Sequence, residues 1–303
     1  MKLGIAVVYM ALEQDAPLLD LHLRFIARHT QVPYTIYAAA NRLPADMRQR
    51  VAETKCVEIC SIPTTDLRGS RENAYYLERL IQVALDDGST HVVTMHVDSF
   101  PVRSGWATTL AEVTSGEAAF AAIVRDEETD PKPMTACLFF PRGFHERHRP
   151  RLLLSPDARR SAVGRAYIAG LANPDESGTG YGYVAAKEGL SWKPLRRSNE
   201  VDDHYFFGSI HGDLVFHLGS AGHPLRTFPG TREYASWIRL RRAVASRLPM
   251  PVRRFARAIL PGRALLPESA GLQAAYDKVH ARLLSDPDAY IARLRFGEGR
   301  TGH

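Results

Sequence analysis

The stretch "HVVTMHVDSFPVRSGW", residues 91–106, decides the fold and raises the first question about a site. Its opening run is apolar and β-branched, which predicts a buried strand, and this run gives way to His96 and Asp98. Side chains two residues apart on a strand share a face. We therefore expect His96 and Asp98 to point the same way at the C-terminal tip of the strand, where open parallel sheets bind their ligands.

Strand and helix patterns alternate along the chain up to this point. Apolar runs predict strands and 3.6-residue periodicity predicts helices, in the order strand 2–10, helix 16–30, strand 34–41, helix 44–54, strand 56–62, helix 70–88 and strand 90–97. This repeated alternation argues for a parallel sheet with helices on both faces.

The regular alternation of strands and helices ends after residue 106, where polar and glycine-rich segments separate shorter elements. We expect, in order, a helix at 107–113, strands at 118–124 and 134–140, helices near 160–171 and at 179–189, and strands at 191–195 and 214–219. The second half is therefore predicted to finish the core of the same sheet.

Bulk composition sets the class of protein. The 303 residues are 45% hydrophobic and 24% charged, which is typical of a globular chain. The three cysteines lack CxxC spacing, and the N-terminal stretch reads as a core strand rather than a signal peptide, so a cytoplasmic location is expected. Residues 231–303 hold 14 Lys+Arg and 6 Asp+Glu, net +8, which leaves the first 230 residues at −2. Such uneven charge is not typical of a nucleic-acid binder.

The basic excess lies in a C-terminal segment, 231–303, that we expect to be a helical extension. Residues 234–267 contain no acid and place apolar residues on one helical face with arginines opposite. Such helices can lie peripherally on an anionic inner membrane surface. They can equally pack on the core with their arginines in solvent.

The motif around His96 resembles one family. His96-Val97-Asp98, followed by Pro101, Gly105 and Trp106, is similar to the DxD motif of family 2-like GT-A glycosyltransferases, with His96 in place of the first acid. The resemblance covers residues 3–220. It implies an α/β fold that is GT-A-like (Rossmann-like), with an open, mostly parallel sheet flanked by helices and a C-terminal helical extension. Residues 1–230 would then be the glycosyltransferase domain, with a nucleotide-sugar-binding half at 1–106 and an acceptor half at 107–230.

The resemblance also implies a divalent metal, Mn²⁺ or Mg²⁺. Asp98 would contact the ion, His96 would contact ribose or join the coordination sphere, and His217, which follows 119 residues after Asp98, would supply a late histidine ligand. His211 and His223 are weaker candidates. The alternative is structural: Asp98 caps a turn, His96 packs against a neighbouring ring, and His217 is a satisfied core histidine.

Two acids are candidates for the base that deprotonates an acceptor hydroxyl. Glu176 and Asp175 precede a predicted helix that ends at Gly189, which resembles the family's xED-like motif, and Glu176 is favoured. Acids at a helix N-terminus also suit its dipole without any catalytic role. Asp202 and Asp203 form a rival pair.

Nucleotide-sugar binding is expected from strand ends and from the start of the 70–88 helix. Asn41 follows the second strand, and Ser70, Arg71 and Asn73 open the helix whose positive end can face a diphosphate. His96 and Asp98 complete this set. Asn and Ser are also ordinary caps, so each assignment has a structural alternative.

The resemblance implies a hexosyltransferase-like, inverting enzyme that moves a sugar from a UDP- or GDP-linked donor to a hydroxyl of a glycan, polysaccharide or lipid-linked acceptor. The acceptor is expected near 134–148. Two alternatives stay open: a sugar-nucleotide nucleotidyltransferase, although no Gly-rich basic loop follows the first strand, and a non-catalytic GT-A-like protein that binds a nucleotide or glycan. The markers of dinucleotide and P-loop sites, GxGxxG and GxxxxGK[ST], are absent.

Overall fold

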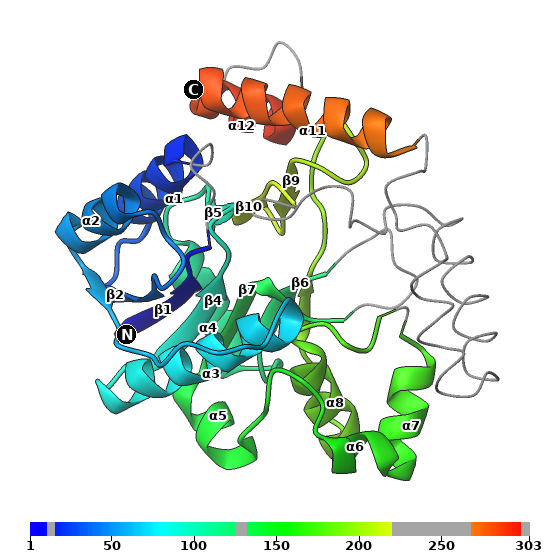
Figure 1. Cartoon of the computed structure of the whole chain (residues 1–303). Coiled ribbons are helices and arrows are strands. Elements are labelled where there is room, and N and C mark those ends of the chain that lie inside the picture. The colour runs from blue at the N-terminus through cyan, green and yellow to red at the C-terminus, as the bar shows by residue number, and fades with distance from the viewer. Residues whose placement is uncertain (11–15, 125–131, 172, 220–267, 298–303) are drawn as a thin grey trace, which may run out of the picture.

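The computed structural model describes residues 1–10, 16–124, 132–171, 173–219 and 268–297 (Figure 1). The expected alternation of strands and helices is present in the first hundred residues. The elements there are β1 (Leu3–Val8), α1 (Ala16–His29), β2 (Tyr34–Ala39), α2 (Ala45–Glu53), β3 (Val57–Ile59), α3 (Ser70–Asp86) and β4 (His91–Met95).

The second half adds strands to the same sheet. Its elements are β5 (Ser99–Pro101), α4 (Trp106–Ser115), β6 (Ala121–Ile123), β7 (Met134–Pro141), α5 (Arg142–His148), α6 (Pro156–Arg160), α7 (Ala162–Ala169), α8 (Thr179–Glu188), β8 (Lys193–Leu195), β9 (Ser209–His211) and β10 (Val215–His217). The helix expected near 160–171 is present as α7, whereas α5, α6, β5 and β9 were not predicted.

Within the described residues the large sheet has seven strands in the order β3-β2-β1-β4-β7-β6-β8. Strands β1, β2, β3 and β4 pair in parallel, whereas β7 runs antiparallel to both β4 and β6. The carboxyl end of β4 therefore lies beside the amino end of β7. The predicted α/β architecture, an open and mostly parallel sheet flanked by helices, is confirmed.

Helices cover both faces of the large sheet. Helices α1, α2 and α4 pack on one face in a cluster that includes Leu23, Met47 and Trp106, and α3, α5 and α8 pack on the other with Leu80 and Tyr181. Because strands with helices on both faces are shielded from water, most of their residues are apolar. Trp106, the last residue of the motif, is fully buried and is part of this core.

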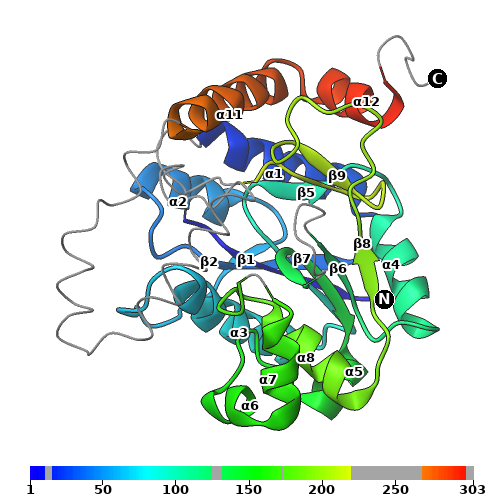
Figure 2. The same cartoon turned by 90° about the vertical axis from the view of Figure 1, so that its right-hand side faces the viewer.

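A small antiparallel sheet, β5-β10-β9, lies beside the large one. Phe100, Ile210 and Phe216 from its three strands share a cluster with apolar residues of α1 and of the C-terminal helices α11 (Glu268–Ser285) and α12 (Pro287–Phe296). Figures 1 and 2 show α11 and α12 lying over α1 and this sheet. The C-terminal helices therefore supply part of the core that supports the small sheet.

The predicted basic helices at 234–267 lie outside the described residues, and the division into 1–230 and 231–303 stays a prediction. Among the described residues, every helix is too short or too polar to cross a membrane.

Candidate metal and nucleotide-sugar site

The turn that carries His96 and Asp98 follows β4 directly. The strand ends at Met95, so His96 and Asp98 lie in the turn to β5 rather than on the strand itself. Ser99 fixes this turn: its backbone N–H donates to the His96 carbonyl at 3.0 Å, and its hydroxyl accepts from the His96 N–H at 2.9 Å. The two side chains nevertheless converge, because the closed turn brings residues 96 and 98 together.

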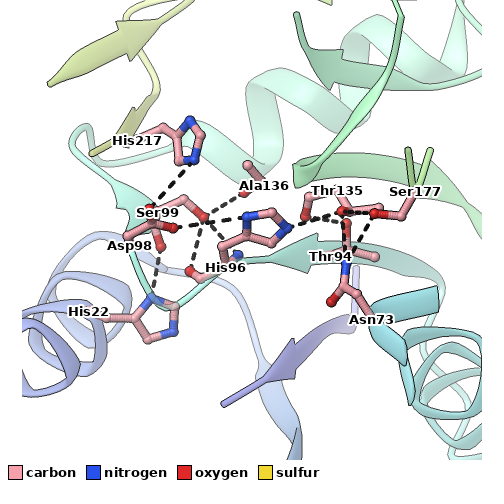
Figure 3. Close-up of polar contacts among 10 residues, drawn as sticks. All are labelled: His22, Asn73, Thr94, His96, Asp98, Ser99, Thr135, Ala136, Ser177 and His217. Atoms are coloured by element: carbon pink, nitrogen blue, oxygen red, sulfur yellow. Dashed lines mark hydrogen bonds and ion pairs between the residues drawn. The ribbon is translucent and has the colours of Figure 1, made fainter. Parts of the chain in front are cut away.

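The pairing of β10 with β5 brings the late histidine to this turn. His217 lies opposite Ser99 in the antiparallel register, and the Leu218 N–H donates to the Asp98 carbonyl at 2.9 Å. Figure 3 shows the His217 and His96 rings on either side of the Asp98 carboxylate. The backbone ladder of the small sheet thus positions a side chain that is more than one hundred residues away in sequence.

The three side chains have the geometry of a cation site. His217 Nε2 lies 3.8 Å from Asp98 Oδ2, and His96 Nδ1 lies 4.0 Å from Asp98 Oδ1. One nitrogen or oxygen of each residue falls within 4.8 Å of the others. These separations are longer than hydrogen bonds. Nitrogen and carboxylate atoms that share a metal ion are spaced in this way, so the donor set fits a divalent cation.

Asp98 is buried, so its charged carboxylate needs a positively charged or hydrogen-bonding partner. Asp98 is 3% exposed and His217 is 8% exposed. A carboxylate removed from water is costly unless a positive charge or hydrogen-bond donors compensate. A cation held between Asp98 and the two imidazoles would provide that compensation.

A polar network continues from His96 to the far side of the turn (Figure 3). His96 Nε2 lies 3.0 Å from Thr135 Oγ1, at the start of β7, and Thr135 Oγ1 lies 3.0 Å from Ser177 Oγ. The Asn73 amide donates to Thr135 Oγ1 at 3.2 Å and to Ser177 Oγ at 3.1 Å. Asn73, predicted for nucleotide-sugar binding, is therefore joined to His96 through a single hydroxyl.

Glu176 and Asp175 have different surroundings. Glu176 forms an ion pair with Lys132 at 2.8 Å, and the Lys132 side chain is only 2% exposed. Asp175 is 61% exposed and pairs with Arg159 at 2.8 Å. Because Ser177 belongs to the network around His96, Glu176 is tied to the site through its neighbour in sequence. Of the two acids, Glu176 is thus the less exposed, at 24% against 61% for Asp175.

The other residues predicted to bind the donor follow the carboxyl ends of strands β2 and β3. The Asn41 amide donates to the Ile62 carbonyl at 3.0 Å and to Tyr76 Oη at 3.4 Å, so this side chain already has a structural role. Ser70 and Arg71 lie in the first turn of α3, where Ser70 is half-buried and Arg71 is exposed.

The weaker candidates are not members of the triad, and one of them lies outside the described residues. His211 is buried, with Nδ1 3.2 Å from the Leu195 carbonyl and its ring centroid 6.4 Å from that of His217. Asp202 pairs with Arg197 at 2.7 Å, and Asp203 forms ion pairs with Arg282 and Arg293 of the C-terminal helices. His223 lies outside the described residues.

Sequence reasoning missed Thr135, Ser177 and Lys132. Thr135 begins a strand that was predicted, but only its antiparallel pairing with β4 reveals that it contacts His96. Ser177 directly follows Glu176 and could have been included with it. Lys132 follows a polar stretch, where a lysine that is almost fully buried is unexpected.

Comparisons with known proteins do not assign this chain to a family. No protein-family model matches the chain, and no curated protein matches it. The chain is similar to two solved structures of the galactosyltransferase LgtC, an active-site mutant and a complex with donor and acceptor sugar analogues, with 13% identity and TM-scores of 0.32 and 0.33. The match covers 49% of this chain and 60% of the LgtC chain. A likeness this distant leaves the chemistry to be argued from the site itself.

Proposed function

We propose that the chain is a glycosyltransferase that moves a sugar from a UDP- or GDP-linked donor to a hydroxyl acceptor. The observation that carries this proposal is the convergence of His96, Asp98 and His217 at the carboxyl end of β4. That edge of an open α/β sheet is where nucleotide ligands bind. A cation-binding triad at that place is suited to the diphosphate of a sugar nucleotide.

In this proposal Asp98, His217 and His96 hold the divalent ion. When bound, the ion supplies positive charge to the nucleoside diphosphate that leaves as the glycosidic bond breaks. Ser70, Arg71 and Asn73 open α3, whose N-terminal N–H groups and positive dipole end favour a diphosphate. Asn41, at the end of β2, would contact the base or ribose.

Glu176 is the proposed base. A carboxylate that removes the proton of the acceptor hydroxyl must be charged and must be held in one place. The ammonium of Lys132 lies 2.8 Å from the carboxylate and holds the side chain in position. Attack by a hydroxyl activated in this way, on the face opposite the leaving diphosphate, gives inversion at the anomeric carbon. We propose a hexosyltransferase-like, inverting reaction.

The acceptor is proposed to be a glycan, polysaccharide or lipid-linked sugar. The side chains of residues 136–140 in β7 are fully buried, so within the expected stretch 134–148 these five are not proposed to contact the acceptor. A lipid-linked acceptor would suit a cytoplasmic enzyme whose basic stretch, 234–267, contacts the inner membrane surface peripherally.

The test is a screen of UDP-, GDP- and CMP-linked sugars, with Mn²⁺ or Mg²⁺, that follows nucleotide release and binding. We expect metal-dependent turnover of one UDP- or GDP-sugar. Glu176→Gln should lower kcat by about 100-fold or more while donor binding stays intact. Asp175→Asn is the matched control and should stay within a few-fold of the unaltered protein.

Several results would contradict the proposal. Donor binding without turnover under any condition would indicate a non-catalytic nucleotide or glycan binder. Formation of a sugar nucleotide from a nucleoside triphosphate and a sugar phosphate would indicate a nucleotidyltransferase. Equal activity of Glu176→Gln and the unaltered protein would remove Glu176 from its role.

A further inference from the structure

The two ring nitrogens of His96 face different partners. Nε2 lies 3.0 Å from Thr135 Oγ1, and Nδ1 lies 4.0 Å from Asp98 Oδ1. Figure 3 shows the ring between these two partners, with one nitrogen toward the carboxylate and the other toward the hydroxyl. The orientation of the ring therefore depends on Thr135 as well as on Asp98.

One assignment of donors and acceptors at Thr135 satisfies every contact and directs the Nδ1 lone pair of His96 toward Asp98. A hydroxyl has one proton to donate and two lone pairs that accept. The Asn73 amide occupies one lone pair, and Ser177 Oγ, 3.0 Å away, can accept the Thr135 proton. The second lone pair then accepts the Nε2–H of His96. In this arrangement the Nδ1 lone pair of His96 faces Asp98.

The backbone of Thr135 is held independently of the site. Its carbonyl accepts a hydrogen bond from the Thr94 hydroxyl at 2.9 Å, and β7 pairs with β4 along the core of the sheet. Thr135 itself is 2% exposed. Hydrogen-bond partners behind a metal-bound histidine fix its tautomer and orientation in this way.

The donor set differs from an all-oxygen site. Two imidazole nitrogens and one carboxylate are offered by His96, His217 and Asp98. The affinity of such mixed nitrogen and oxygen sites rises from Mn²⁺ through Co²⁺ to Cu²⁺ and is also high for Zn²⁺, whereas Mg²⁺ and Ca²⁺ prefer oxygen ligands. A carboxylate at position 96 would return the site to two oxygens and one nitrogen.

We propose that Thr135 is a positioning residue that directs Nδ1 of His96 toward Asp98, and that the resulting site selects a transition ion such as Mn²⁺, Co²⁺ or Zn²⁺ over Mg²⁺ and Ca²⁺. This inference rests on the metal site of the proposed function and specifies both its geometry and its ion. Of the two ions considered for the proposed function, this selectivity favours Mn²⁺ over Mg²⁺.

The experiment titrates the full chain with Co²⁺, followed by its visible absorption and by calorimetry, and then competes the bound ion with Mg²⁺. We expect one site that is lost in Asp98→Asn, which separates it from binding by other histidines. Thr135→Val removes the hydroxyl but keeps the shape, and should weaken Co²⁺ binding by about 10- to 100-fold. Thr135→Ser restores the hydroxyl and should bind Co²⁺ within a few-fold of the unaltered protein.

His96→Asp tests the choice of ion. This variant should narrow the preference for Co²⁺ over Mg²⁺, and its Co²⁺ spectrum should shift because one nitrogen ligand is replaced by oxygen. Thermal unfolding of each variant checks that the fold is retained. Equal affinity of Thr135→Val and Thr135→Ser, or displacement of Co²⁺ by equimolar Mg²⁺ from the unaltered protein, would overturn the inference.

Failure of this inference and failure of the proposed function give different results. Sugar transfer that proceeds as well with Mg²⁺ as with Mn²⁺ would leave the transferase intact and reject the selectivity. Tight, Thr135-dependent Co²⁺ binding in a chain that turns over no sugar nucleotide would support the site and reject the transferase.

Discussion

The large sheet and the small sheet contribute to the site in different ways. Within the described residues the large sheet has seven strands, four of them five to eight residues long, with helices on both faces, and His96 follows its strand β4. Each strand of the small sheet has only three residues, and His217 is the last residue of β10. A sheet this small needs packing from other elements to be stable. The comparison indicates that the site depends on how the small sheet is docked.

Helix α1 and the C-terminal helices provide this docking. His22 of α1 donates its Nδ1–H to the Ser99 carbonyl of β5 at 2.8 Å. Asp203, in the loop before β9, pairs with Arg282 of α11 and Arg293 of α12. Side chains of α1 and of the C-terminal helices α11 and α12 thus hold the small sheet in place.

The largest effect is expected where the two sheets meet. Asp98→Asn keeps the size of the side chain but removes the charge that both histidines flank. Its metal affinity should fall by more than the roughly 100-fold that changes behind the ligands produce. Calorimetric titration with Mn²⁺ measures this loss, and circular dichroism checks the fold. Retention of full affinity would place the metal elsewhere.

A core truncation in the small sheet should affect the site more than an equal one in the large sheet. Phe216→Ala removes a fully buried ring beside His217 and should lower the free energy of unfolding by about 3–5 kcal/mol. Leu80→Ala, on α3 and equally buried, should cost about 2–5 kcal/mol. Metal affinity, measured well below both unfolding transitions, should drop only in Phe216→Ala. Equal affinities would show that the small sheet is not the weaker support.

The contact between α1 and the small sheet should make stability depend on pH. Burial lowers the pKa of His22 from 6.5 to about 4, so the folded state keeps this ring neutral while the unfolded state takes up a proton. Stability is therefore present above pH 6.5 and is lost as pH falls toward 4, by at most about 3 kcal/mol. His22→Asn keeps a donor for the Ser99 carbonyl without titrating. Its denaturant unfolding curves should shift less between pH 6.5 and 4; an unchanged pH dependence would assign it to other groups.

The ion pairs of the C-terminal helices should act locally. Asp203 is 7% exposed in its side chain, so Asp203→Asn should cost about 1–3 kcal/mol and should speed hydrogen exchange in β9, β10, α11 and α12 while β1 and β4 stay protected.

The matched control is Asp288→Asn on α12, whose ion pair with Arg28 of α1 is exposed at both ends. This change should cost less than about 1 kcal/mol. Uniform exchange changes across both sheets in Asp203→Asn, or equal costs for the two variants, would contradict the local role of Asp203.

Sequence patterns predicted the large sheet because its elements are long and periodic. The same patterns missed β5 and β9, because turn-forming residues bound these two short strands: β5 ends at Pro101, and β9 lies between Gly208 and Gly212. The pairing of β10 with β5, which brings His217 to Asp98, is a long-range contact that local periodicity does not encode.

Only part of the site could be predicted from the sequence, again because some of its contacts join residues that are far apart in the chain. His96, Asp98 and His217 were identified by residue type and motif position, and the structure brings them together. Thr135 has no chemical signature of its own, and its contact with His96 follows from the antiparallel direction of β7. The parallel sheet expected from the first half gave no indication of that reversal.

The most direct test of the central claim is a crystal of the protein grown with Mn²⁺ and measured at a wavelength where manganese scatters anomalously. The account predicts a single strong peak within roughly 2.0–2.5 Å of His96 Nδ1, an Asp98 carboxylate oxygen and His217 Nε2. A strong peak at another position, with none between these three side chains, would contradict it.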